Sequence, residues 1–219
     1  MKKSVLLLGL LVACGGDDGD GPTIITPDAP GGGNVDASQP ANCALAAELG
    51  TAPPSSETFF VIPEGETVPA LYYTGAPLNQ DAMPDILWVD LWDGYGAFEN
   101  GFPTAGTTIQ LTGDEAGADT CGACVSVWAD ATQQSREDYF ATGGTLQLTS
   151  VSQTSVAGML TNVTFAHVNI DEQSLATTPH PDGCTSALTS FSFSGTPMME
   201  PANVAGAPQR WKLQLKKQK

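Results

Sequence analysis

Short segments in which apolar and polar residues alternate recur along the chain from residue 43 onwards. In the segment ILWVDLW, Leu87, Val89 and Leu91 occupy every second position, and this period places their side chains on one face of a β-strand. The same alternation is found in TTIQLT, CVSVWAD, GTLQLTSV and SFSFSG, and further apolar segments are FFVIP, ALYYT and LTNVTFAHVNI. Clusters of Gly, Pro, Asn and Asp separate the segments, so the pattern predicts a mainly β, antiparallel protein.

Residues 43–209 are numerous enough to form one domain with its own core. We expect this domain to be a single antiparallel β-sandwich, jelly-roll or Ig-like, with little helix. The segment NCALAAELG is the main helical candidate, with Asn42 as its N-cap and Gly50 just after its end.

The first residues combine a positive start with a short apolar run. Lys2 and Lys3 precede residues 5–13, which are apolar apart from Gly9. This run is much shorter than the roughly 20 residues that cross a bilayer. The segment is therefore interpreted as an export signal covering residues 1–13.

The signal ends in Leu11, Val12, Ala13 and Cys14, which resemble the lipobox of bacterial lipoproteins. The resemblance implies that the Cys14 thiol receives a diacylglyceryl group, that the chain is cut before Cys14, and that the new amino terminus is acylated. Several acyl chains at one residue are sufficient for stable anchoring, whereas one chain is not. Gly15, rather than an aspartate, follows the cysteine, which in this family favours the outer membrane, on its periplasmic or exposed side.

Residues 14–42 form a segment rich in Gly, Asp and Pro with almost no apolar side chains. This composition is typical of a disordered linker. A flexible chain of this length has a root-mean-square span of about 30 Å, so we interpret it as a lipidated tether that holds the domain away from the membrane surface.

Charge is distributed very unevenly. The chain has 24 acidic and 8 basic residues, and between Cys14 and Gln209 the only basic residue is Arg136. Such a body repels nucleic acid, which excludes nucleic-acid binding. The basic segment 210–219 is interpreted either as a last strand or as a tail that contacts anionic lipid or cell-wall polymer.

Four cysteines follow Cys14: Cys43, Cys121, Cys124 and Cys184. An even number in an exported chain predicts two disulfides, and four cysteines allow three pairings. We favour long-range pairs that join Cys121 and Cys124 to Cys43 and Cys184. The CGAC segment resembles the thioredoxin redox motif, but a strand pattern rather than a helix follows it. A four-thiolate zinc site is disfavoured because only one close cysteine pair exists.

The segment DILWVDLWDGYG is a candidate ligand-binding surface. Trp88, Asp90 and Trp92 share one face of the expected strand and Tyr95 follows. Aromatic rings stack on sugar rings, and carboxylates accept hydrogen bonds from hydroxyl groups, so these four residues are candidates for carbohydrate binding. The competing interpretation is that the indoles pack beneath a second layer.

Asp93 and Glu99 are weak candidate ligands for calcium, since their spacing does not match an EF-hand loop. No other cofactor is expected beyond the covalent lipid on Cys14.

The two histidines provide the only candidates for a general base. His167 lies mid-strand, in phase with Val163 and Phe165, and His180 lies in the turn segment TPHPDGC. A secreted hydrolase would also need a presented serine, and no G-x-S-x-G motif is present. We therefore do not expect an enzyme.

These features together predict a lipid-anchored cell-envelope protein with a binding or structural role. The layout resembles bacterial surface lipoproteins without an assigned activity, through the lipobox, the tether and the TCGACVSVWAD segment. The expected partners are membrane lipid through Cys14 and an envelope polysaccharide or another envelope protein. The alternatives are a carbohydrate- or calcium-binding module and a secreted hydrolase.

Overall fold

The computed structural model describes residues 40, 42–63, 66–132 and 136–199. The chain divides into two compact units, residues 1–37 and 38–219, and every described residue belongs to the second. The expected signal peptide, Cys14, nearly all of the expected tether and the basic segment 210–219 therefore lie outside the described residues. In the described part of the chain, no helix has both the length and the apolar character needed to cross a membrane.

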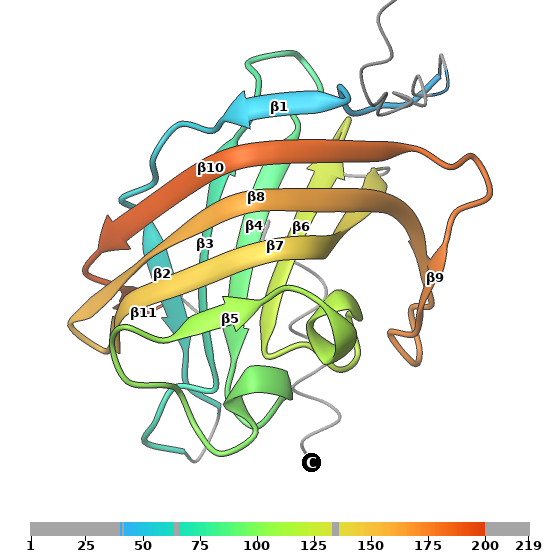
Figure 1. Ribbon diagram of the computed structural model, residues 1–219. Helices are drawn as coiled ribbons and strands as arrows, with labels where there is room; N and C mark the ends of the chain where they lie inside the picture. The colour runs from blue at the N-terminus through green and yellow to red at the C-terminus, as the bar shows by residue number, and fades with distance from the viewer. Residues whose placement is uncertain (1–39, 41, 64–65, 133–135, 200–219) are drawn as a thin grey trace, which may run out of the picture. The chain divides into compact units, whose positions relative to one another are not determined.

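The described residues form one mixed sheet of eleven strands (Figure 1). The strands are β1 (Glu48–Thr51), β2 (Thr58–Val61), β3 (Leu71–Pro77), β4 (Ile86–Trp92), β5 (Thr108–Gln110), β6 (Ala123–Ala129), β7 (Glu137–Ser152), β8 (Ser155–Ile170), β9 (Thr177–Pro179), β10 (Thr185–Gly195) and β11 (Met198–Met199). Two short 3-10 helices, η1 (Gly96–Phe98) and η2 (Gly113–Ala116), are the only helical elements described. The order in the sheet is β1-β10-β8-β7-β6-β4-β3-β2-β11, while β5 pairs with β7 and β9 with β8.

The mainly β class is confirmed, but the architecture differs from the expected antiparallel sandwich. Hydrogen-bonded pairing joins all eleven strands, nine along one path and β5 and β9 as branches from it, so the described part of the chain does not separate into two sheets. The β1–β10 and β2–β11 pairs are parallel, whereas the remaining pairs are antiparallel. The sheet curls, so that β7, β8 and β10 face β3, β4 and β6 (Figure 1).

The curl has a local cause in β7 and β8. Their pairing shifts register around Gly143 and Gly144, and such irregularities bend a strand and increase its twist. Gly144 has φ +101°, and a Cβ there would lie 2.6 Å from the carbonyl oxygen of Asn162, which itself has φ +50°. The bend lets β7 pair with β6 at its start and with β5 further along, which joins two layers into one sheet.

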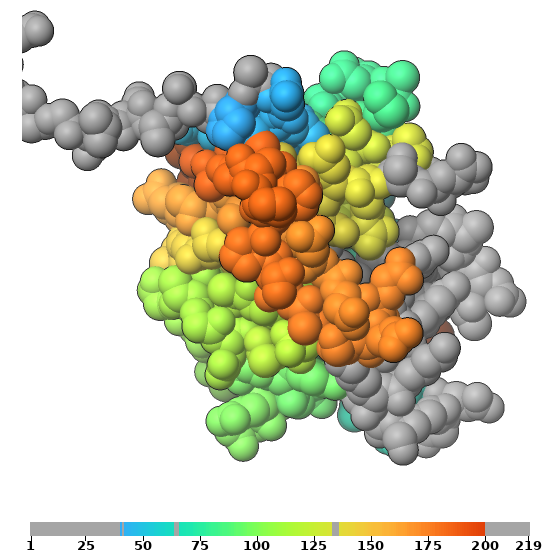
Figure 2. All heavy atoms as spheres, turned by 90° about the vertical axis from the view of Figure 1, so that its right-hand side faces the viewer, coloured from blue at the N-terminus to red at the C-terminus, as the bar shows by residue number. Residues whose placement is uncertain are grey.

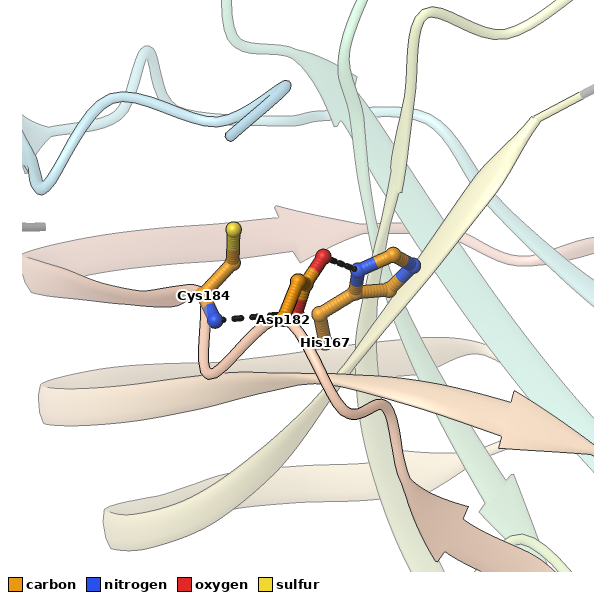
Figure 3. A group of neighbouring side chains, drawn as sticks. All are labelled: His167, Asp182 and Cys184. Atoms are coloured by element: carbon orange, nitrogen blue, oxygen red, sulfur yellow. Dashed lines mark hydrogen bonds and ion pairs between the residues drawn. The ribbon is translucent and has the colours of Figure 1, made fainter. Parts of the chain in front are cut away.

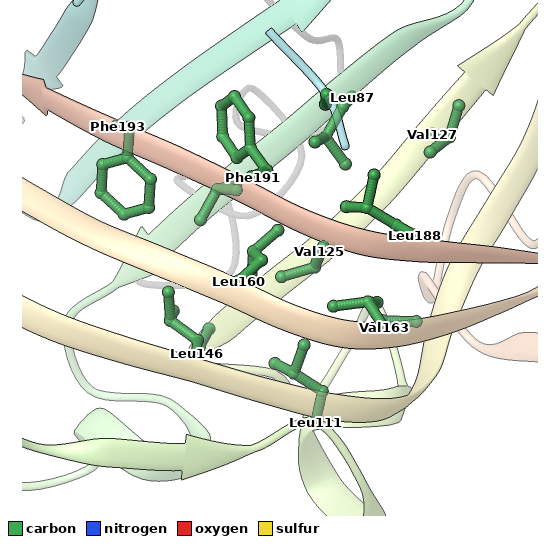
Figure 4. Close-up of a cluster of buried hydrophobic side chains, with 14 of the residues drawn as sticks. Leu87, Leu111, Val125, Val127, Leu146, Leu160, Val163, Leu188, Phe191 and Phe193 are labelled. Atoms are coloured by element: carbon green, nitrogen blue, oxygen red, sulfur yellow. The ribbon is translucent and has the colours of Figure 1, made fainter. Parts of the chain in front are cut away.

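The main core fills the space inside the curl. Alternate residues of the strands point into it, as the period of two predicts. Figure 4 shows Leu87 and Val125 on one side of this space and Leu160, Leu188 and Phe191 on the other; all five are buried. A second apolar cluster contains Leu71, Tyr73, Trp92, Ala118, Cys121, Cys124, Phe140, Val168 and Leu175. Because β6 lies between the two clusters, all seven of its residues are buried.

The segment expected to be helical contains a strand instead. Residues Glu48–Thr51 form β1, which runs parallel to β10. The amide of Ala187 donates to the carbonyl oxygen of Ala47, and the amide of Ala52 donates to that of Ser190. Pairing with the edge of β10 thus satisfies backbone groups that a helix of one or two turns would leave largely unpaired.

Candidate functional site

The four cysteines of the domain form two disulfides, as expected, but with a different pairing from the favoured one. Cys43 bonds to Cys184 and Cys121 to Cys124, with Cα–Cα distances of 5.6 and 5.2 Å. Cys43 and Cys184 belong to the main core, whereas Cys121 and Cys124 belong to the second cluster. The favoured bridges between the two pairs are therefore absent, because each of the four sulfurs is already bonded within its own pair.

The two disulfides also argue against the alternative roles of the cysteines as a redox pair or as zinc ligands. Cys121 and Cys124 are buried, with 1% and 4% of their surface exposed, and Cys124 lies in β6 rather than at a helix start. A reactive redox pair needs an accessible, electropositive setting. All four sulfurs are oxidised, so no thiolate remains among them for zinc.

The aromatic segment packs into the second cluster. Trp88, Asp90 and Trp92 do share one face of β4, but Trp92 is only 1% exposed and Asp90 only 5%. Trp88 is half-buried, with its ring 6.2 Å from that of Tyr73 and 5.3 Å from that of Trp128. With Trp92 and Asp90 buried, this strand does not present the pair of exposed indoles that the carbohydrate hypothesis requires.

The remaining candidates, at the end of this segment, do not come together as a set of metal or sugar ligands. Tyr95 is half-buried and packs against the second cluster. Asp93 is half-buried, while the exposed Glu99 accepts a hydrogen bond from the side-chain Nδ2 of the neighbouring Asn100 at 3.3 Å. A potential metal-binding group among the described residues lies elsewhere, at His167, Asp182 and Cys184.

Both histidines meet at one carboxylate, an arrangement that the sequence did not reveal. His167 lies in β8, next to the turn formed by residues 180–183 (Figure 3). In this turn Pro181 and Asp182 occupy the two central positions, and Gly183 follows with φ +70°. Proline and aspartate suit these positions, and glycine accepts the positive φ without strain. The turn therefore follows directly from the local sequence HPDG.

Asp182 Oδ2 lies 2.6 Å from His167 Nδ1 and 3.0 Å from His180 Nδ1. Its other oxygen accepts a hydrogen bond from the amide of Cys184 at 3.0 Å. Because a carboxylate only accepts, the Nδ1 atom of His167 carries the proton in this bond. The group formed by His167, His180 and Asp182 is called the His-Asp-His cluster below.

Stacking and backbone bonds fix both imidazole rings. The His167 ring stacks on Tyr139, its cross-strand neighbour, at 4.9 Å and on His180 at 4.0 Å. The amide of His180 donates to the carbonyl oxygen of His167, and the amide of His167 donates to that of Cys184, each at 2.9 Å. The ring positions therefore depend on the sheet and on the Cys43–Cys184 bond.

The cluster is electrostatically biased towards an ionised Asp182. Partial burial raises the pKa of this carboxyl, but the hydrogen bonds from the Cys184 amide and His167, together with the adjacent His180 ring, outweigh it and lower the pKa to about 2. Glu137 Oε2 lies 3.9 Å from His167 Nε2. Burial raises the pKa of the Tyr139 hydroxyl above its ordinary value. The phenol therefore stays neutral at physiological pH.

A histidine held by a carboxylate is also the base half of a hydrolytic triad. Within the described part of the chain, however, neither imidazole hydrogen-bonds to a serine or threonine hydroxyl. The nearby Cys184 sulfur is tied up in its disulfide. The cluster as described thus offers two imidazoles and a carboxylate, and no nucleophile beside them.

Comparison with protein-family models, with curated proteins and with solved structures finds no match to this chain.

Proposed function

We propose that this protein is an exported, lipid-anchored protein of the bacterial cell envelope whose β domain has a binding or structural role rather than a catalytic one. The observation that carries the proposal is the pair of disulfides, Cys43–Cys184 and Cys121–Cys124. Disulfides of this structural kind persist in oxidising compartments and are rare in the cytosol. The lipobox ending at Cys14 supplies the matching export and anchoring signal.

The position of the Cys43–Cys184 bond supports a tethered domain. Cys43 lies at the start of the described domain, just before the edge strand β1, and Cys184 immediately precedes β10. A force applied through the preceding segment is therefore transmitted covalently to the long strand β10, which pairs with β8 over most of its length. Without this bond, the force would act on the few hydrogen bonds of β1.

The acidic body fits the same location. Its negative charge keeps an exported domain soluble and repels it from anionic headgroups. The lipid on Cys14 therefore attaches the protein to the membrane. We place the anchor in the outer membrane because Gly15 follows the cysteine. Its partners there are membrane lipid and an envelope polysaccharide or protein.

Replacing the lipid-bearing cysteine tests the proposal. In a bacterial host fed an alkyne-tagged fatty acid, the wild-type chain is expected to carry the tag and to sediment with membranes. Cys14→Ser is expected to lose the tag completely, because serine offers no thiol for the diacylglyceryl group. Gly16→Ser, just outside the lipobox, is the matched control and should remain tagged. Tagged and sedimenting Cys14→Ser would contradict the proposal.

A further inference from the structure

Three potential metal-ligand atoms converge in the His-Asp-His cluster. The Nδ1 atoms of His167 and His180 lie 2.6 and 3.0 Å from the same oxygen of Asp182. Imidazole nitrogen and carboxylate oxygen are the ligands that zinc and its neighbours in the first transition row bind. We propose that this cluster is a binding site for one divalent transition-metal ion, with Zn²⁺ as the best-suited ion.

Both distances between a histidine Nδ1 and Asp182 Oδ2 are close to those of a loaded site, whereas the two imidazole rings, stacked with their centroids 4.0 Å apart, must turn so that both Nδ1 lone pairs point at one ion. Ligand atoms about 2.0–2.2 Å from a tetrahedral zinc ion lie about 3.3 Å from each other. The His180–Asp182 distance of 3.0 Å is near this value, and the His167–Asp182 distance of 2.6 Å must open by less than an ångström. Asp182 can make this movement because its side chain is 30% exposed and lies in a turn.

Protons balance when the ion binds. In a neutral imidazole that carries its proton on Nδ1, this proton moves through water to Nε2 as the ion takes its place, and an imidazolium ring instead releases its Nδ1 proton to solvent. In His167 this Nε2–H faces Glu137 Oε2, now 3.9 Å away. A carboxylate that accepts from the far nitrogen of a ligating histidine fixes the ring and strengthens it as a ligand. Glu137 is therefore assigned as the outer partner of His167.

The scaffold holds the ligands before any ion arrives. His167 is stacked between Tyr139 and His180, and two backbone hydrogen bonds join β8 to the turn. The Asp182 carboxylate is oriented by the Cys184 amide, and Cys184 is itself held by the disulfide to Cys43. The backbone positions of the ligands are thus fixed before the ion binds, which reduces the conformational freedom lost on binding.

The side chains of His180 and Asp182 are partly exposed, so an ion can reach the carboxylate and water can complete its coordination. His180 and Asp182 have side chains 33% and 30% exposed. Figure 2 shows the segment that leads from β8 through β9 to β10, in orange, at the surface of the domain. The negative body attracts cations, while two imidazole ligands favour transition metals over Ca²⁺ and Mg²⁺, which prefer oxygen.

Metal binding to the purified full chain tests the proposal directly. After dialysis against Zn²⁺ and removal of free ion, elemental analysis is expected to find one zinc per chain. Co²⁺ should give the visible absorption of a low-symmetry site, and Ca²⁺ in excess should not displace Zn²⁺. In the long-range histidine NMR spectrum, Zn²⁺ should shift the Nδ1 signals of both histidines.

Three variants locate the site. His180→Gln and Asp182→Asn are each expected to weaken zinc binding by about tenfold or more, and Glu137→Gln by about tenfold. Glu99→Gln removes one carboxylate outside the cluster and is the matched control, with unchanged affinity expected. A wild-type chain that takes up no zinc, or equal losses of zinc affinity in Glu99→Gln and Asp182→Asn, would overturn the proposed site.

If a variant fails to fold, the histidine spectrum of the wild-type chain decides, because zinc bound elsewhere leaves the Nδ1 signals unmoved. The test does not involve the lipid, so its outcome is independent of the proposed anchoring.

Discussion

Replacing Cys43 and Cys184 together with alanine is expected to lower the free energy of unfolding by about 5 kcal/mol. The bond joins residues 141 positions apart, so its loss restores a very large amount of conformational freedom to the unfolded chain. It also releases β1, a short edge strand that pairs only with β10 among the described strands. Urea unfolding followed by tryptophan fluorescence, with and without the bond, measures the difference.

The second disulfide provides the matched control for this prediction. Cys121 and Cys124 are separated by only 3 positions, so the double alanine variant at these positions is expected to lose about 2 kcal/mol. Cys121, Cys124 and Cys184 are similarly buried and Cys43 is partly buried, so the packing loss for the long bridge is no larger than that for the short one. Equal losses for the two double variants would contradict the view that the long bridge acts mainly by closing a large loop.

Glu115→Ala is expected to destabilise the domain by about 3 kcal/mol, because a buried backbone donor would lose its partner. Glu115 lies in an acidic loop that looks solvated in the sequence, yet it is only 5% exposed. Its Oε1 accepts a hydrogen bond from the amide of Ala97 at 2.6 Å, and its Oε2 accepts one from the amide of Ala123 at 2.5 Å. The carboxylate thus links η2 to η1 and to the first residue of β6. Gly96 fits beside it because a Cβ there would clash with Oε1.

The adjacent Asp114 gives a control with the same change in charge. It is exposed, so Asp114→Ala is expected to change the free energy of unfolding by no more than about 0.5 kcal/mol. Both variants reduce the net negative charge by one, so the difference between them isolates the two hydrogen bonds of Glu115. Chemical denaturation of the two variants measures it, and indistinguishable midpoints would show that Glu115 does not hold this region together.

The strands could be predicted from the sequence because their signal is local. Leu87, Val89 and Leu91 alternate along β4, and the structure buries all three in the main core. The curled sheet could not be predicted in the same way. It depends on a bend at Gly144 that meets Asn162 across the β7–β8 pair, and a period of two carries no information on which strands face each other.

The same limit applies to the site. The turn at residues 180–183 has a clear local signature, with proline, aspartate and glycine in suitable positions. The contact between this turn and His167 depends on the pairing of β8 with β9 and β10. This pairing joins residues far apart in the sequence, so no local signature predicts it. The available signal was a pair of histidines, of which His180 lies two residues before Asp182 and four before Cys184, and the tertiary fold was needed to join them.

The burial of Trp92 and the partial burial of Trp88 are likewise tertiary effects. Trp88 and Trp92 share a face of β4, as their spacing requires, but spacing does not tell whether a second layer covers that face. The structure places Trp92 in the second cluster with Tyr73 and Phe140. The aromatic residues that looked suited to a ligand therefore stabilise the sheet.

Intact mass spectrometry of the protein extracted from membranes tests the proposed envelope anchoring most directly, because one mass reports the amino terminus, the lipid and the disulfides together. We predict a chain that begins at Cys14, carries a diacylglyceryl group and an N-acyl group, and lacks two hydrogens for each of its two disulfides. A chain with an unmodified Cys14 and four reduced domain cysteines would contradict both the anchor and the oxidising compartment.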